Sequence, residues 1–294
     1  MGTVYESEGV RWAEYVVGCL DILGQSGEMR VLSVLPSNRA EADGFRLAAH
    51  KSYDAVRMIQ KWLQRSPDQG RDPAKAHPYY GGLSDVQRRE VAKLGGKELK
   101  HHFFGDTFLI YGRMLNDEEE PAIANVLALL SKVALVMFGC LSGKIPLRGG
   151  IEVGVGAEME GRGIYGPALI DPHRLEAEVA QYPRIVIGPR LTSRLSALAQ
   201  SAESGQDLHD INRAFVEGCL PYIGRDVDGW SIVDYLGEGV SRVVEGDPVT
   251  ENGRKLMDFV EGECERFGRE KNTKLAFRYR LLRDYCSRRL SEWP

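Results

Sequence analysis

Apolar and polar residues along the first part of the chain predict a strand followed by a helix. Tyr15 to Leu23 is a short apolar run with a carboxylate, Asp21, near its end, which is typical of a buried strand. From Asp43 to Gln64, apolar residues recur at three- or four-residue steps. This spacing predicts an amphipathic helix, and we expect Asp43 to cap its start.

A hairpin and a buried helix are predicted next. Leu99 to Phe104 and Thr107 to Tyr111 are β-prone runs on either side of Gly105-Asp106, a strong hairpin signal. Pro121 to Leu141 follows and contains the most apolar run of the chain. That run is shorter than the ~20 residues of a membrane span and is interrupted by Lys132, so it indicates a buried helix.

The remaining pattern completes an α+β chain. Further predicted elements are a strand at Pro146–Gly156, a helix at Pro167–Gln181, a strand at Arg184–Ile187, a helix at Leu191–Gln200, a last strand at Gly229–Leu236 and a basic helix or helix pair at Arg254–Arg289. Arg65 to Gly96 is rich in Pro, Gly and charge and predicts a loop or insertion. This order favours an antiparallel or mixed sheet with helices mainly on one face, built on a ferredoxin-like or palm βαββαβ core.

Composition and charge narrow the class of protein. The chain has 294 residues, a hydrophobic fraction of 43% and a net charge of −4, which argues against a dedicated nucleic-acid binder. Its five cysteines are scattered and never spaced as C-x-x-C, so neither a disulfide framework nor a zinc site is expected. The polar N-terminus lacks a signal-peptide core. We therefore expect a cytoplasmic protein without membrane insertion.

Two carboxylates are the first candidate chemistry. Asp21 lies in an apolar strand, where a charge is costly unless it is paired or coordinated, and Asp106 lies at a hairpin tip. On adjacent strands they would clamp two divalent cations, which stabilise both the attacking and the leaving oxygen of a phosphoryl transfer. Either residue alone is more simply explained as a turn or strand-end residue. The pair, in this strand order, favours the metal site.

Glycine-rich segments are the second candidate. Leu147 to Gly154 and Gly166 to Glu176 contain glycines that permit close backbone approach. Neither a P-loop nor a dinucleotide-binding fingerprint is present. Arg174, on the second segment, has a planar fork suited to phosphate, although by itself it is better explained as a solvent-facing helix arginine.

Together these motifs resemble class III nucleotide cyclases. Cys19–Gly24, His102–Asp106, Leu147–Gly154 and Gly166–Glu176 occur in the family's order. Asp226–Leu236 resembles the divergent bacterial pyrimidine cyclases of the Pycsar antiphage system. The resemblance covers about residues 12 to 240. It implies a cyclase catalytic domain over residues 1–245, with a basic helical extension, 246–294, packed on the same domain.

The resemblance also implies a site. Asp21 and Asp106 match the metal carboxylates, the backbone carbonyl of Ile22 is a further ligand, and the metals are Mn²⁺ or Mg²⁺. The family works as a head-to-tail homodimer with active sites at the interface. Arg174 matches its transition-state arginine, which comes from the opposite subunit. The turn from Leu23 to Gly27, including Gly24, is expected to offer backbone N–H groups to the phosphates.

Departures from the purine cyclases favour a smaller base. His102 stands where a base-reading lysine is usual, the other base-reading position falls near Gly163, and Ile170 replaces an asparagine. Tyr53 is a candidate to fill the pocket and bond a pyrimidine edge, although a core aromatic is an equal explanation. Arg162 is a weaker candidate.

The resemblance favours UTP over CTP, so cyclic UMP is the expected product, sensed by a separate effector during infection. The alternatives left open are a cytidylate cyclase, a catalytically inactive nucleotide-binding regulator and a palm-type nucleotidyltransferase with a linear product. The basic tail is expected to be a solvated helix face, with docking on its own core or binding of an anionic partner as alternatives.

Overall fold

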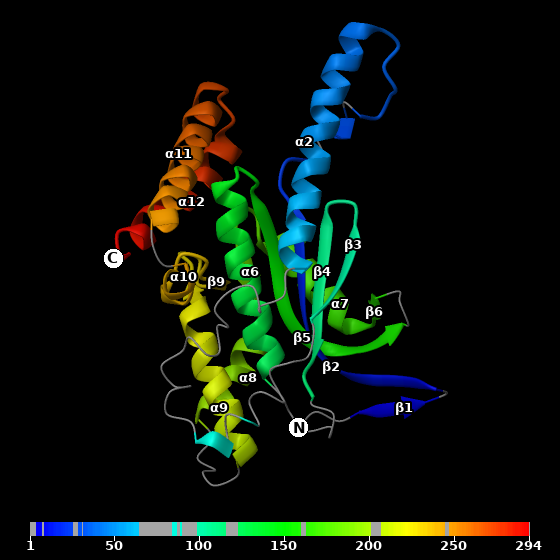
Figure 1. Cartoon of the computed structure of the whole chain (residues 1–294), viewed down its shortest axis with the longest axis vertical. Coiled ribbons are helices and arrows are strands. Elements are labelled where there is room, and N and C mark those ends of the chain that lie inside the picture. Colours follow the sequence, from blue (N-terminus) through cyan, green and yellow to red (C-terminus); the bar gives the residue numbers. More distant parts are fainter. Residues whose placement is uncertain are drawn as a thin grey trace.

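The chain folds around one mixed sheet of nine strands (Figure 1). The computed structural model describes residues 4–7, 9–25, 29–30, 32–64, 84–86, 89, 99–115, 123–159, 163–200, 207–244 and 247–293. The strands are β1 (Tyr5–Ser7), β2 (Val10–Ile22), β3 (Lys100–Phe104), β4 (Thr107–Arg113), β5 (Leu147–Met159), β6 (Gly163–Tyr165), β7 (Ile185–Ile187), β8 (Ile223–Arg225) and β9 (Ser231–Val233). They lie in the order β3-β4-β2-β5-β7-β9-β8, with β1 paired to β2 and β6 to β5. The predicted class, α+β with a mixed sheet, is confirmed.

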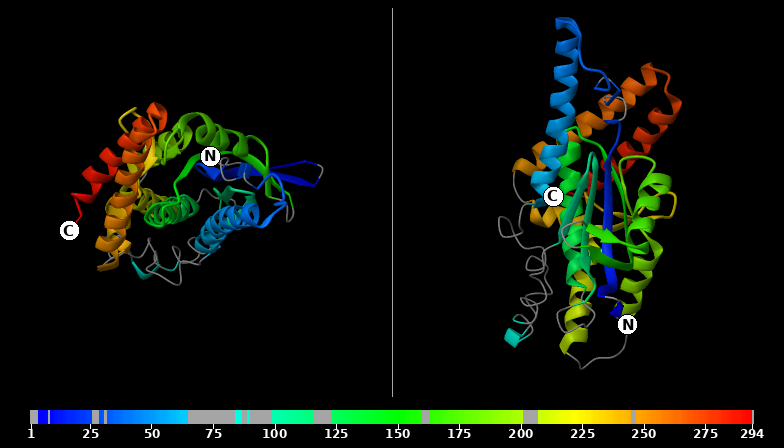
Figure 2. Two further views of the ribbon diagram at one scale, coloured as in Figure 1. Left: turned by 90° about the horizontal axis from the view of Figure 1, so that it is seen from above. Right: turned by 90° about the vertical axis from the view of Figure 1, so that its right-hand side faces the viewer.

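Helices cover both faces of this sheet. The main ones are α2 (Arg39–Gln64), α6 (Ala124–Ser142), α7 (Pro167–Arg174), α8 (Pro189–Gln200), α9 (Asp207–Cys219), α10 (Glu238–Val243), α11 (Asp247–Arg269) and α12 (Thr273–Leu290), with a π-helical turn η2 (Leu175–Val179) and a 3-10 turn η3 (Leu220–Tyr222). Seen from above, α2 and α6 lie on one side of the sheet and α7 on the other (Figure 2). The prediction of helices mainly on one face is therefore wrong for α7. Glycines in β5 permit this approach, since a Cβ at Gly150 would lie 2.3 Å from the Pro172 carbonyl oxygen.

The first six core elements form a split β-α-β-β-α-β unit. They follow one another as β2, α2, β3, β4, α6 and β5. Strand β4 lies between β2 and β3, and β2 lies between β4 and β5, with every neighbouring pair antiparallel. This is the strand order that the sequence predicted for the core. It places the end of β2 beside the β3–β4 hairpin tip.

Strand β2 divides its side chains between the two faces of the sheet. Leu20 and Ile22 belong to the main core, which includes α6, whereas Val17 packs with Ala168 of α7. Because side chains alternate along a strand, Asp21 points to the α7 face. Helix α6 is the one described helix long and apolar enough to cross a membrane, but 78% of its apolar window is buried inside the fold. It is a core helix, as predicted.

Helix α2 begins four residues before the predicted start. The Asn38 side chain caps it by accepting a hydrogen bond from the Glu41 N–H at 3.0 Å, and the Glu41 carboxylate accepts one from the Ser37 N–H at 2.9 Å. This reciprocal pattern resembles a capping box. Asp43 is therefore not the cap, and instead pairs with Arg46 at 2.8 Å. The N-terminal half of α2 extends beyond the sheet (Figure 1).

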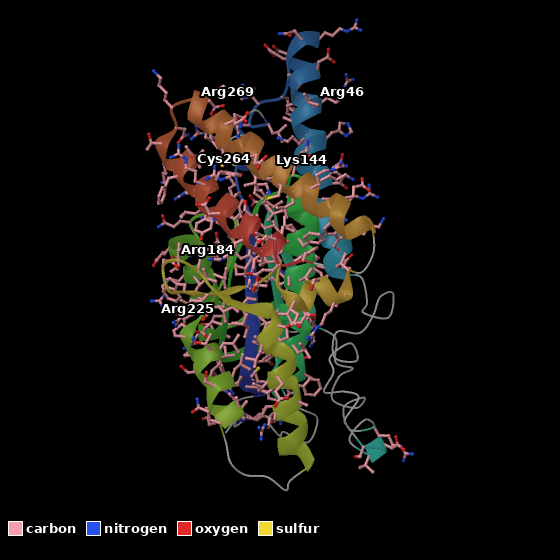
Figure 3. The ribbon with its side chains drawn as sticks, turned by 90° about the vertical axis from the view of Figure 1, so that its left-hand side faces the viewer. Arg46, Lys144, Arg184, Arg225, Cys264 and Arg269 are labelled. Carbon is pink, nitrogen blue, oxygen red and sulfur yellow. The ribbon has the colours of Figure 1, made fainter. Side chains whose placement is uncertain are left out.

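The C-terminal segment is a pair of helices, α11 and α12, docked on the main core. Side chains of both helices are buried in the same cluster as α6. The buried Asp234 accepts a hydrogen bond from the Tyr285 hydroxyl at 2.7 Å and pairs with Arg289, and the indole of Trp293 donates to the Leu236 carbonyl at 2.7 Å. Figure 3 shows this side of the molecule, with Cys264 and Arg269 on α11. One face of the basic segment therefore docks on its own core rather than lying wholly in solvent.

Some elements were not predicted, and one prediction lies largely outside the described residues. The strands β1, β6 and β8 and the helices α9 and α10 were not predicted; all but α9 are too short to carry a periodic pattern. The predicted loop or insertion at 65–96 falls mostly outside the described part of the chain, where only 84–86 and 89 are placed.

Candidate active site at the end of β2 and the start of β4

Strand pairing places Asp21 and Asp106 at the same end of neighbouring strands. Asp21 is the penultimate residue of β2 and lies opposite Thr107, the first residue of β4. Asp106 directly precedes Thr107, in the two-residue turn of the β3–β4 hairpin. Gly105, the other turn residue, has φ of 59°, a conformation that glycine adopts without steric cost. The turn therefore fixes Asp106 beside the end of β2.

The two carboxylates share one electrostatic neighbourhood. Burial raises the pKa of Asp21, and the negative charge of Asp106 raises it further, whereas Arg148 lowers it. The Asp21 side chain retains 19% of its exposure, so it is sheltered yet reachable. Asp21 and Asp106 therefore lie at the same end of the sheet, and the charge of Asp106 makes Asp21 harder to ionise.

Arg148 and Glu176 complete this cluster, and sequence reasoning missed both. The Arg148 Nη2 lies 3.2 Å from Asp21 Oδ2, and its Nε lies 2.7 Å from Glu176 Oε1. Burial raises the pKa of Glu176, Arg148 lowers it, and Asp21 and Asp106 raise it again. Both residues lie in the glycine-rich motifs, Arg148 opposite Asp21 across the β2–β5 ladder. A charged residue at the start of a buried strand was the available signal, and the same reasoning had selected Asp21.

The donor set at this end of the sheet fits a hard divalent cation. The pKa values of Asp21 and Glu176 are raised, and the negative charge of Asp106 contributes to both shifts. A cation bound near these three carboxylates would relieve their repulsion. Oxygen ligands of this kind suit Mg²⁺ and Mn²⁺. Within the described residues no three His, Cys, Asp or Glu side chains gather around a single point. Any cation would therefore take Asp21 and Asp106 together with main-chain or substrate oxygens, and the Ile22 carbonyl follows Asp21 directly.

Within its own chain, Arg174 pairs with Asp171 and not with Asp21 or Asp106 in any described contact. It is the last residue of α7, its side chain is 62% exposed, and its Nη2 lies 3.5 Å from Asp171 Oδ1. The positive charges with the largest effect on Asp21 are those of Arg148 and then His173. Most of the Arg174 side chain is thus accessible to another molecule.

Tyr53 and the Gly24 turn lie close to one another but not inside the fold. Tyr53 is 65% exposed on α2. Its neighbour Ser52 is buried and donates to Gln25 Oε1 at 3.2 Å, which ties the turn after β2 to α2. Gly24 in that turn has φ of 91° and open space around it. Arg162 and the last residues of the predicted phosphate-binding turn, 26–27, lie outside the described residues.

The two positions compared with purine-reading residues lie side by side. His102 on β3 is 3.5 Å from where a Cβ at Gly163 would stand, although the two residues are far apart in sequence. Gly163 has φ of 99°, which disfavours any residue with a side chain. The His102 ring packs on Phe104 with a centroid separation of 4.3 Å. The structure thus brings His102 and Gly163 into one small region.

In comparisons with known proteins, no family model and no curated sequence matches the chain.

Proposed function

We propose that the chain is a pyrimidine nucleotide cyclase of the class III type, which converts UTP to 3′,5′-cyclic UMP and pyrophosphate. The observation that carries this proposal is the convergence of Asp21 and Asp106 at one end of the sheet, where their charges oppose each other. The split β-α-β-β-α-β core supports the class, because it is the fold that the motif resemblance implies.

Asp21 and Asp106, with the Ile22 carbonyl, hold two divalent cations, Mn²⁺ or Mg²⁺. When bound, the cations lower the pKa of the ribose 3′-hydroxyl and hold the triphosphate oxygens. Arg148 orients Asp21 through its 3.2 Å contact. A bond forms between the 3′-oxygen and the α-phosphorus, the bond to pyrophosphate breaks, and the hydroxyl proton leaves to solvent. Arg174 of a second subunit offsets the charge that grows on the α-phosphoryl group.

The base is a pyrimidine in this proposal. His102 and Gly163 lie together, as two base-reading positions should, yet neither supplies the lysine or acidic group of a purine reader. Tyr53, and Arg162 beside Gly163 in sequence, are the residues proposed to contact the smaller base, and the Gly24 turn meets the phosphates. UTP is preferred to CTP on the motif resemblance, and a cytidylate cyclase is the alternative.

The active enzyme is a homodimer with its sites at the interface. Arg174 is exposed in the single chain and pairs only weakly with Asp171, which supports a role at the site of a second copy. The product serves as a cytoplasmic second messenger for antiphage defence, sensed by a separate effector.

The test is to incubate the protein with each of the four ribonucleoside triphosphates and manganese, and to identify the products by mass. Cyclic UMP is expected, and Asp106→Ala should make none. Cyclic CMP would select the cytidylate alternative, and cyclic AMP would contradict the pyrimidine proposal. Unchanged triphosphate with metal-dependent binding would indicate an inactive regulator, and a linear product would indicate a nucleotidyltransferase.

A further inference from the structure

Asp171, on helix α7, contacts two arginines with its two carboxylate oxygens. Arg174 lies one helical turn further along α7, and its Nη2 is 3.5 Å from Asp171 Oδ1. The guanidinium of Arg190, on helix α8, donates a hydrogen bond to the other oxygen, Oδ2. Asp171 therefore links the exposed Arg174 side chain to a second helix.

Arg190 is in turn held by a buried carboxylate in the sheet. Glu152, in the middle of β5, has a side chain that is only 3% exposed. Its two oxygens accept hydrogen bonds from the main-chain N–H of Arg190 at 3.1 Å and from that of Leu191 at 2.7 Å. These N–H groups lie in the first turn of α8 and have no partner within the helix, so the buried acceptor fixes the start of α8 and the position of Arg190.

This arrangement gives the Arg174–Asp171 pair a fixed direction. An exposed ion pair one helical turn apart contributes little to stability. Asp171, however, is held from its other side by Arg190, which restricts the directions in which its carboxylate can turn. Among the described contacts of Arg174, only Nη2 is engaged. A guanidinium has five N–H donors, so those on Nε and Nη1 can reach a phosphoryl oxygen of another molecule.

We propose that Asp171, held by Arg190, positions Arg174 for the active site of the second subunit. This inference rests on the proposed function and deepens it, because it names the residues that orient the arginine supplied across the interface. Asp171 is a positioning residue, since it acts through Arg174 and contacts neither the nucleotide nor the cations. An arginine that is oriented in advance loses less conformational entropy when it meets the α-phosphoryl group.

The first test measures kcat and KM for UTP with manganese, in the full-length protein. Asp171→Asn keeps the shape of the side chain but removes its charge. It should lower kcat about 10- to 100-fold with KM nearly unchanged, because a misplaced Arg174 fails in the transition state and not in ground-state binding. Arg190→Gln should lower kcat in the same way but less. Glu238→Gln, which removes a comparable helix pair with Arg242, is the matched control and should change kcat less than about twofold.

Mixing subunits distinguishes positioning across the interface from a structural role within the chain. Asp171→Asn and Asp106→Ala are combined in equal amounts, with subunit exchange followed by native mass spectrometry. Each mixed dimer should have one site that joins an intact Asp106 to an intact Asp171–Arg174 pair, so the mixture should recover about a quarter of wild-type activity. Exchange without recovery would overturn the inference, because Asp171 would then act within its own chain. So would normal kcat in Asp171→Asn, or in Arg190→Gln if Asp171→Asn does not fold.

Side-chain NMR separates this inference from the proposed function. The Arg174 Nε–H signal, identified by its loss in Arg174→Ala, reports picosecond-to-nanosecond motion through its order parameter. The order parameter should be lower in Asp171→Asn than in wild type, and equal values would overturn the inference even if cyclic UMP forms. A lower value in Asp171→Asn, with no cyclic product from the wild type, would refute the cyclase and keep Asp171 as the residue that orients Arg174.

Discussion

Two arginines, Arg184 and Arg148, each pair with two carboxylates. Arg184 lies at the β7–β8 side of the sheet, and Arg148 lies at the candidate site. The Arg184 side chain is 5% exposed, and its terminal nitrogens lie 2.5 Å from Asp226 and 2.7 Å from Asp228. It also donates to the Val179 carbonyl at 2.8 Å. Burial opposes ionisation of Asp228, but hydrogen bonding and charge from Arg184 lower its pKa overall. One arginine here faces two carboxylates and still keeps the pKa of one of them below its usual value.

At Arg148 the carboxylate pKa values shift in the opposite direction. Arg148 contacts Asp21 and Glu176, yet the pKa of each carboxylate is raised, by burial and by the charges of the other acids. One arginine does not offset three carboxylates when Asp106 is included. The comparison teaches that Arg184 outweighs burial at Asp228, whereas burial and the neighbouring acids outweigh Arg148 at Asp21 and Glu176. A cation would relieve the larger excess of negative charge at the second cluster.

The largest effect on activity is expected from removing a carboxylate at the candidate site. Asp106→Ala should lower cyclase activity at least about a thousandfold, because a cation loses one of two side-chain ligands. Steady-state product formation with manganese measures it. Asp43→Ala, an exposed aspartate on α2, is the control and should keep its activity. More than a tenth of wild-type activity in Asp106→Ala would contradict the metal site.

A mixing experiment tests whether Arg174 of one subunit acts at the carboxylates of the other subunit. Asp106→Ala and Arg174→Ala should each be inactive, and an equal mixture should recover about a quarter of wild-type activity. Half of randomly formed dimers are mixed, and each mixed dimer has one intact site of two. Native mass spectrometry confirms subunit exchange. If exchange occurs without recovered activity, Arg174 does not act across the interface.

The cluster around Arg184 should contribute to the stability of the fold. Arg184→Met leaves the buried Asp226 and the exposed Asp228 without their partner and should lower the free energy of unfolding by about 3–5 kcal/mol, mainly through Asp226. Arg225 is a matched control, since it is exposed on β8 on the same side of the molecule (Figure 3). Arg225→Met should change stability by less than about 0.5 kcal/mol, measured by urea unfolding. Equal effects at the two positions would remove the distinction.

The smallest expected effects are opposite in sign at the two clusters. Because the folded pKa of Asp228 is lowered, its stabilisation is complete above the ordinary pKa of about 3.9 and is lost as pH falls through the folded value. The folded pKa of Asp21 is raised, so its ionised form costs stability at pH 7, and this cost disappears as pH falls through the raised value.

In metal-free buffer at pH 7, Asp228→Asn should therefore destabilise and Asp21→Asn should stabilise the fold. Both changes should be about 0.5 kcal/mol, because both side chains are partly solvent-screened. Urea unfolding at pH 7 and at pH 4 measures them: the Asp21→Asn difference should shrink at pH 4, whereas the Asp228→Asn difference should persist there and shrink only at lower pH. A destabilised Asp21→Asn protein at pH 7 would show that Arg148 already balances the site.

Local patterns predicted the elements that present the candidate carboxylates. The apolar run ending near Asp21 and the Gly105-Asp106 turn each carry their signal within a few residues. Long periodic segments, such as α6 and the helix pair α11–α12, were predicted for the same reason. The start of α2 was missed because its cap, formed by Asn38 and Glu41, lies upstream of the apolar repeat.

Partners far apart in sequence escaped prediction. Arg148 meets Asp21 only through the register of β2 on β5, and Glu176 reaches Arg148 only because the glycines of β5 admit α7 and η2. Nothing local encodes such contacts, so Asp21 and Asp106 were predicted while Glu176 and Arg148 were not.

The position of α6 in the core has a consequence for synthesis of the chain. This helix ends at Ser142, but the helices α11 and α12 that cover part of it begin at Asp247. At a translation rate of ~5–20 residues per second, the ribosome needs roughly 5 to 20 seconds to make the intervening residues. During that interval the face of α6 that packs against α11 lacks its cover, although α2 and the sheet can already cover other parts of the helix. A chaperone that binds exposed apolar segments is therefore expected to bind the nascent chain at this stage.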